Sequence, residues 1–191
     1  MTRPSRELVH ETLTEHIEVL KLLASQADTI IQIATAISRA ISSGHKLLVF
    51  GNGGSAADAE HMAAELVGRF EQTRAGLPAI ALSSNVASVT AISNDYGYCE
   101  VFARQIEALG QVGDVAVAIT TSGRSENVLL GLKAARSTGL VTVALTGDAG
   151  LAIDHADIQL RVASKRTARV QEAHVTAIHC ICELVEQDFV R

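Results

Sequence analysis

The fold is decided by the stretch KLLVFGNGGSAADAEHMAAELVGRF, which spans residues 46–70. It opens with a short apolar run, which predicts a buried strand, and it closes with a segment that has the pattern of a helix. Between them lies Gly51-Asn52-Gly53-Gly54-Ser55, whose glycines allow the backbone to approach a ligand closely. Because the start of a helix offers unpaired N–H groups, the stretch indicates an anion site. A tight turn with an N-cap at Ser55 or Asn52 is the alternative interpretation.

The same alternation of apolar run and helix continues to the end of the chain. The further apolar runs and helical segments occupy residues 79–83, 86–93, 98–109, 115–120, 126–137, 141–146, 158–162 and 167–189. Strands that alternate with helices imply right-handed βαβ units and a parallel sheet. Aromatic residues make up only 3% of the chain, so the core is aliphatic, as suits buried parallel strands. We therefore expect an α/β fold, a doubly wound parallel five-stranded sheet flanked by helices, in a single domain of residues 1–191.

A long helical segment precedes the first strand. Between residues 8 and 41, apolar residues recur at steps of three and four, and the stretch SQAD at 25–28 can break the segment into two helices. This apolar stripe exceeds what one small sheet needs. We expect residues 1–44 to form an N-terminal helical extension that serves oligomerisation. Ordinary packing on the same domain is the alternative.

Charge, cysteine content and hydropathy argue against several classes of protein. The net charge is −5 and no long basic run occurs, which disfavours nucleic-acid binding. Cys99, Cys180 and Cys182 form no C-x-x-C motif, so neither a disulfide framework nor a cysteine zinc site is expected, and a reducing compartment fits. No signal peptide is evident, and no stretch reaches the length of a membrane span. We expect a cytoplasmic protein with no nucleic-acid or membrane partner.

A second polar loop, Thr120-Thr121-Ser122-Gly123-Arg124-Ser125, also follows a strand and opens a helix. Its hydroxyl and amide groups can form a neutral phosphate cradle, to which Arg124 could add charge. N-capping by Ser122 or Ser125 is the alternative for one of them, but it does not explain four hydroxyls in six residues. A third loop, Thr146-Gly147-Asp148, has the character of a plain turn.

Candidate acid–base groups lie in two of the expected helices. His61 and Glu65 are four residues apart and share one helix face, where they can bind a metal or handle protons; an ordinary surface pair is the alternative. In the last helix, His174 and His179 differ by about 140° in direction, so His174 is better explained as a packed or capping histidine. Gln171 and His179 lie within about 80° of one another but about 12 Å apart in rise. Either Gln171 precedes the regular helix, or different subunits contribute the two residues to one site.

Taken in order, these motifs resemble the phosphoheptose isomerases, a branch of the sugar isomerase (SIS) domain family. The resemblance covers essentially the whole chain. The residues that carry it are GNGGSAADAEHMAAELVGRF (51–70), LPAIALS (77–83), AISNDYGYCEVFARQ (91–105), GDVAVAITTSGRSENV (113–128) and ARVQEAHVTAIH (168–179). The chain departs from the family pattern at Thr120, where serine is usual, and at Arg124, where asparagine is usual. Thr120 keeps the hydroxyl, whereas Arg124 could strengthen anion binding or reshape the sugar pocket.

The resemblance implies a homotetramer with sites between subunits and a phosphosugar substrate. It implies substrate contacts at Asn52, Gly53, Gly54, Ser55, Asn94, Asp95, Thr120, Thr121, Ser122, Ser125 and Gln171. It also implies one zinc ion per subunit, bound by His61, Glu65, Gln171 and His179.

The implied activity is the interconversion of sedoheptulose 7-phosphate and D-glycero-D-manno-heptose 7-phosphate through an enediol. This is the first step of nucleotide-activated heptose biosynthesis, which supplies the lipopolysaccharide core or another heptose-containing product. The resemblance points to Glu65 as the catalytic base and His179 as the acid. The alternatives are an isomerase of another phosphosugar and a non-enzymatic SIS-domain protein that binds the replication initiator. The second class is expected to lack counterparts of Glu65 and His179, both of which this chain has.

Overall fold

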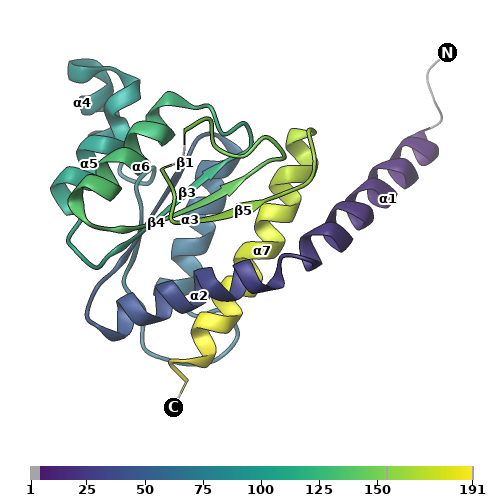
Figure 1. Cartoon of the computed structure of the whole chain (residues 1–191), viewed down its shortest axis with the longest axis horizontal. Helices are drawn as coiled ribbons and strands as arrows, with labels where there is room; N and C mark the ends of the chain where they lie inside the picture. Colours follow the sequence, from purple (N-terminus) through teal and green to yellow (C-terminus); the bar gives the residue numbers. More distant parts are fainter. Residues whose placement is uncertain (1–4, 154, 191) are drawn as a thin grey trace.

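The computed structural model describes residues 5–153 and 155–190, so residues 1–4 of the expected N-terminal extension lie outside the described part. Helices and strands alternate along most of the chain (Figure 1). The elements are α1 (Ser5–Ala24), α2 (Ala27–Ser42), β1 (Leu47–Gly51), α3 (Gly54–Val67), β2 (Ala79–Ala81), α4 (Val86–Tyr96), the 3₁₀ helix η1 (Tyr98–Glu100), α5 (Val101–Leu109), β3 (Val115–Thr120), α6 (Glu126–Thr138), β4 (Val141–Thr146), β5 (Ile158–Arg161) and α7 (Thr167–Gln187).

Within the described residues, five strands form one parallel sheet in the order β2-β1-β3-β4-β5. β1 pairs with β2 on one side and with β3 on the other, and Gly51 of β1 lies opposite Ile119 of β3. After β1, the chain therefore adds β2 on one side of β1 and then returns to add β3 on the other side. In open α/β sheets, ligands bind beyond the carboxyl ends of the strands at such a switch point. The expected doubly wound parallel sheet is confirmed.

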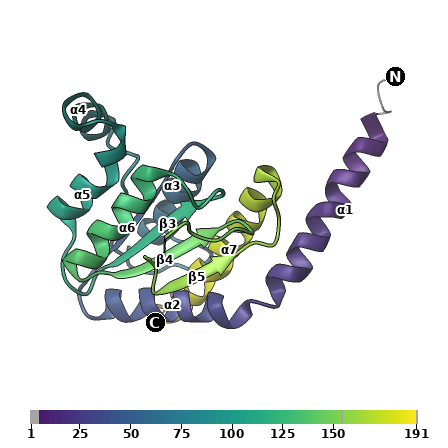
Figure 2. The same cartoon turned by 45° about the horizontal axis from the view of Figure 1, so that its top comes forward.

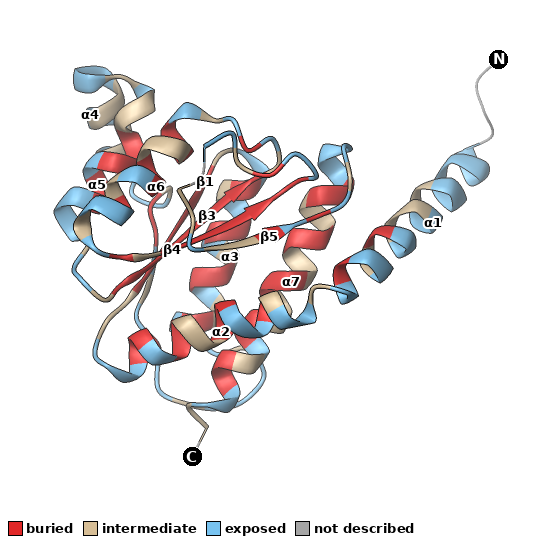
Figure 3. Ribbon diagram, viewed as in Figure 1, coloured by how far each residue is buried: buried red, intermediate tan, exposed pale blue. Residues whose placement is uncertain are grey.

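Different helices cover the two faces of the sheet, and alternate residues of β1 show this most simply. Leu47 and Val49 belong to a buried cluster with residues of α2, α3 and α7. Leu48 and Phe50 point the other way and pack with residues of α5 and α6. Figure 3 shows the buried strands between these layers. The packing holds α3 and α7 against the same face of the sheet, which matters for the site below.

The N-terminal segment divides into two helices, as the polar stretch at residues 25–28 suggested. α2 lies on the sheet, and its residues Ile33 and Ile37 are fully buried. α1 projects away from the sheet (Figure 2) and leaves Leu8, Leu13 and Ile17 more than half exposed. Ordinary packing therefore accounts for the buried apolar residues of α2. It does not account for Ile31 of that helix, which is half exposed, or for these residues of α1. None of the helices, over the residues described, is long and apolar enough to cross a bilayer.

Candidate active site

The glycine-rich loop after β1 and the hydroxyl-rich loop after β3 come together at the carboxyl end of the sheet. With the start of α7 they enclose a pocket of about 190 Å³. It is lined by Asn52, Ser55, Ile119, Thr120, Thr121, Ser122, Ser125, Thr167 and Gln171. The sequence singled out most of these residues but missed Thr167, a hydroxyl at the start of a helix after a loop, like those of the second loop.

Three helices begin at this pocket, and none has a side chain that caps its first turn. The N-cap residues are Gly53 for α3, Ser125 for α6 and Arg166 for α7, and none of them makes a side-chain capping hydrogen bond. The alternative of an N-cap at Ser55 or Asn52 is therefore wrong. At the start of α3, the N–H groups of Ser55 and Ala56 donate to the carbonyl oxygens of Asn52 and Gly53 at 3.0 Å. Each helix start still carries a partial positive charge, so an anion is favoured here.

The hydroxyl-rich loop is held in shape by its own side chains. Thr120 Oγ1 accepts a hydrogen bond from the N–H of Gly123 at 3.2 Å, and Ser122 Oγ accepts one from the N–H of Arg124 at 3.2 Å. Gly123 has a φ of +66°, and a Cβ there would lie 1.8 Å from the carbonyl oxygen of Gly150. Only glycine fits this position, so the loop conformation depends on it.

Three polar residues singled out from the sequence do not line the pocket. Asn94 and Asp95 are exposed on α4, where Asn94 Nδ2 donates to Asp95 Oδ1 at 2.8 Å. Arg124 belongs to the hydroxyl-rich loop, but it is exposed and is not among the residues that line the pocket. Within one chain these side chains have no contact with the pocket, and their role in ligand binding stays a prediction.

Further along α3 and α7, three candidate side chains converge. His61 Nε2 lies 3.0 Å from Glu65 Oε1 and 3.4 Å from His179 Nε2, and the candidate ligand atoms are all within 4.8 Å of one another. Each of the three residues is partly buried. Two imidazole nitrogens that face each other this closely need a proton or a cation between them. The cluster can therefore transfer protons or hold a metal ion.

Gln171 lies apart from this cluster. Because α7 begins at Thr167, the interpretation in which Gln171 precedes the regular helix is wrong. Its amide instead lies against the start of α3, where a Cβ on Gly54 would be 2.2 Å from Gln171 Nε2. From Gln171 to His179 the helix rises by about 12 Å. A single chain thus brings three of the four predicted zinc ligands together, and the fourth lines the pocket.

Several known proteins are similar to this chain in sequence and in fold. A SIS-domain family model matches residues 13–147. The phosphoheptose isomerase of Aquifex aeolicus is 49% identical over 183 residues, which make up 95% of this chain and 96% of that protein. The chain belongs to the phosphoheptose isomerase family. The phosphoheptose isomerase of Roseiflexus sp. is 51% identical over 87% of this chain and 85% of that protein. The solved structure of a phosphoheptose isomerase from Francisella tularensis has a TM-score of 0.92 at 37% identity, covering 98% of this chain and 100% of that one.

This member of the phosphoheptose isomerase family places further groups around the cluster. The ring centroid of Phe70 lies 5.5 Å from that of His179, so Phe70 packs against the imidazole. Asp58 is buried in α3, one turn before His61. Burial raises the pKa of Asp58 to about 6, although the nearby His61 lowers it. Neither Phe70 nor Asp58 was recognised from the sequence, because their importance depends on how α3 and α7 pack.

His174, the other histidine of α7, lies in the core of this phosphoheptose isomerase family member. Its side chain is fully buried, and Nε2 is 3.2 Å from the carbonyl oxygen of Thr146. Burial lowers the pKa of His174 to about 4, while the hydrogen bond to Thr146 raises it. The packed histidine expected from the sequence is what the structure contains.

This burial predicts acid sensitivity. An unfolded histidine binds a proton below a pKa of about 6.5, whereas folded His174 stays neutral down to about 4. Between these two pKa values the unfolded state binds more protons than the folded state. As the pH falls from about 6.5 to about 4, we therefore expect His174 to lower the free energy of unfolding by about 3 kcal/mol. Urea unfolding from pH 7 to pH 4 should show a smaller loss in His174→Gln than in the parent. His10→Gln, an exposed control, should keep the parental pH dependence, and equal slopes for all three proteins would contradict the prediction.

Proposed function

We propose that the protein interconverts sedoheptulose 7-phosphate and D-glycero-D-manno-heptose 7-phosphate through an enediol, at the first step of nucleotide-activated heptose biosynthesis. The observation that supports this most is a pocket at three uncapped helix starts, built on the same two helices that carry the His61–Glu65–His179 cluster. Relatives of nearly equal length carry the name phosphoheptose isomerase.

In this proposal, the phosphate binds in the pocket. It lies at the positively polarised starts of α3, α6 and α7 and accepts hydrogen bonds from the hydroxyls of Thr120, Ser122 and Ser125. These donors are neutral, and together with the helix dipoles they supply the attraction for a dianion. No lysine or arginine lines the pocket among the residues described, so the helix starts provide most of the binding.

The cluster then moves the protons. Interconversion of a ketose and an aldose requires a base at carbon and an acid at oxygen. The Glu65 carboxylate takes the proton from the carbon beside the carbonyl and returns it to the neighbouring carbon. His179 donates a proton to the carbonyl oxygen and later takes one back. The hydrogen bond from His61 orients Glu65, and Phe70 limits the motion of the His179 ring.

The same three residues fit a zinc ion. Two imidazole nitrogens and one carboxylate oxygen are donor types that zinc commonly binds in proteins. We propose that His61, Glu65 and His179 hold one zinc ion per subunit and that Gln171 completes the ligand set from another subunit. When bound, such an ion would polarise the carbonyl group and stabilise the negative charge of the enediolate.

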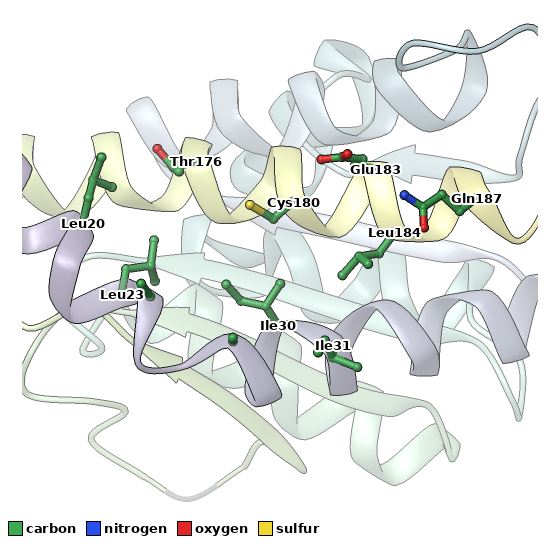
Figure 4. Close-up of a pocket in the computed structure, with 11 residues that line it drawn as sticks. Leu20, Leu23, Ile30, Ile31, Thr176, Cys180, Glu183, Leu184 and Gln187 are labelled. Atoms are coloured by element: carbon green, nitrogen blue, oxygen red, sulfur yellow. The ribbon is translucent and has the colours of Figure 1, made fainter.

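We further propose that residues 1–44 mediate a homotetramer. α1 leaves the body of the chain with exposed apolar residues, and an apolar hollow of about 470 Å³ lies where α1 and α2 meet α7. Figure 4 shows Leu23 and Ile30 facing Cys180 and Leu184 across this hollow. A second subunit seated there would remove this apolar surface from water.

A direct assay with and without a chelator tests the proposal. The purified protein is incubated with sedoheptulose 7-phosphate, and formation of the aldose phosphate is followed by NMR. We expect turnover that is lost after chelation and restored by added zinc. Turnover that survives chelation would contradict the zinc proposal alone. A lack of turnover even with added zinc would contradict the isomerase proposal.

A further inference from the structure

A polar contact outside the proposed catalytic groups reaches the wall of the pocket. Tyr98 lies in η1, and its hydroxyl donates to Asn52 Oδ1 at 2.9 Å. Asn52 belongs to the glycine-rich loop and lines the pocket. The two residues are 46 positions apart in the sequence, so the contact depends on the fold and not on a local motif.

Asn127 of α6 completes a network of three side chains. Asn127 Nδ2 donates to Asn52 Oδ1 at 2.9 Å, and Asn52 Nδ2 donates to Asn127 Oδ1 at 2.8 Å. Asn127 is buried, with only 4% of its surface exposed, whereas Asn52 is partly exposed at the pocket. Asn52 Oδ1 thus accepts two hydrogen bonds, from Tyr98 and from Asn127. One N–H of the Asn52 amide is left over for a ligand.

This arrangement restricts the amide of Asn52 from two sides. Asn127 approaches from α6 and Tyr98 from η1, so neither the position nor the direction of the amide is free to change without losing a hydrogen bond. A polar group held in place before the ligand arrives loses less conformational entropy on binding. Tyr98 itself is 54% exposed and is not among the pocket residues, so it acts through Asn52.

We propose that Tyr98 is a positioning residue for the sugar phosphate site, which it orders by fixing the Asn52 amide. This inference rests on the proposed function only in its choice of ligand. It predicts that removal of one hydroxyl, outside the pocket, weakens binding of the sugar phosphate without weakening the fold.

The test is a double-mutant cycle of Tyr98→Phe and Asn52→Ala. Binding of sedoheptulose 7-phosphate is measured by calorimetry, KM and kcat are measured separately, and thermal unfolding is recorded for every variant. A net hydrogen bond corresponds to about a three- to tenfold change in an equilibrium constant. We expect Tyr98→Phe to raise Kd and KM by that factor, with an unchanged midpoint of unfolding. In the Asn52→Ala background, the same change should have no further effect.

Tyr96→Phe is the matched control. Tyr96 is exposed to almost the same degree, at 55%, and its ring packs over the guanidinium of Arg104, a contact that phenylalanine keeps. The Kd of the Tyr96→Phe variant for the sugar phosphate should equal that of the parent. If Tyr98→Phe also equals the parent, or weakens binding equally in the Asn52→Ala background, the inference is overturned.

The binding measurement separates this inference from the proposed function. If the parent protein binds the sugar phosphate but does not convert it, the isomerase proposal is contradicted. The Kd values of the double-mutant cycle would still test the role of Tyr98. A parent protein that does not bind the sugar phosphate would overturn both.

Discussion

Replacement of Glu65 by glutamine is expected to lower kcat for the isomerisation by about 10²- to 10⁴-fold, the range that general acid–base catalysis supplies. Glutamine has the size of glutamate but cannot accept the proton from carbon. It also removes a negative charge from a cluster in which His61 Nε2 lies 3.0 Å from the carboxylate. The measurement is the rate of aldose phosphate formation by NMR at saturating substrate, with folding and oligomeric state checked on the same sample.

The matched control for this change is Glu60→Gln in the same helix. Glu60 is exposed and accepts a hydrogen bond from the Ser83 hydroxyl at 3.1 Å, away from the cluster. The kcat of the Glu60→Gln variant should therefore stay close to that of the parent. Zinc content measured alongside kcat separates the two roles of Glu65. If Glu65→Gln loses both zinc and turnover, and added zinc restores both, the residue is a ligand and not the base. If the variant keeps most of its turnover, the base assignment is wrong.

The sheet, and the edge of it that carries the candidate site, could be predicted because both follow from local patterns. Apolar runs mark the strands, and residues that follow two parallel strands, such as Asn52 and Thr121, lie at the same carboxyl edge of the sheet. The pairing of His61 with Glu65 also follows from helix periodicity, since the two lie one turn apart. For these features, local patterns in the sequence are enough to predict the geometry.

The remaining parts of the site depend on contacts between elements that are distant in sequence. α7 packs along α3, and this packing brings His179 to His61 and Gln171 to Gly54. The eight residues from Gln171 to His179 in α7 thus span about the same distance as the seven from Gly54 to His61 in α3. No local pattern indicates the register between two helices. The hydrogen bond from Tyr98 to Asn52 is of the same kind.

A further feature that no pattern indicated lies between the end of α3 and the end of α7. The Glu186 carboxylate accepts hydrogen bonds from the backbone N–H groups of Phe70, Glu71 and Gln72 at 2.8–2.9 Å. It also pairs with Arg74 Nε at 3.2 Å, with both side chains almost fully buried. Arg74 in turn donates to the carbonyl oxygens at the end of α3, including that of Glu65. Glu186 thus joins the segment that carries Phe70 to the helix that carries His179.

We expect Glu186→Ala to lower the free energy of unfolding by about 3–5 kcal/mol at pH 7, the cost of removing one partner from a buried ion pair. Three backbone N–H groups would also lose their acceptor. Urea unfolding at one fixed protein concentration measures the change. Glu107→Ala on the exposed surface of α5 is the control and should stay within about 0.5 kcal/mol of the parent.

The pH dependence of this effect identifies its cause. Burial raises the pKa of Glu186, but hydrogen bonds from Gln72, Glu71 and Phe70 and the charge of Arg74 outweigh it, so the pKa lies below its ordinary value. A carboxylate with a lowered pKa stabilises the fold above its ordinary pKa and loses that contribution as the pH falls through the folded value. The difference between the parent and Glu186→Ala should therefore shrink in acid. A difference that stays constant from pH 7 to pH 3 would assign the effect to lost packing instead of the carboxylate charge.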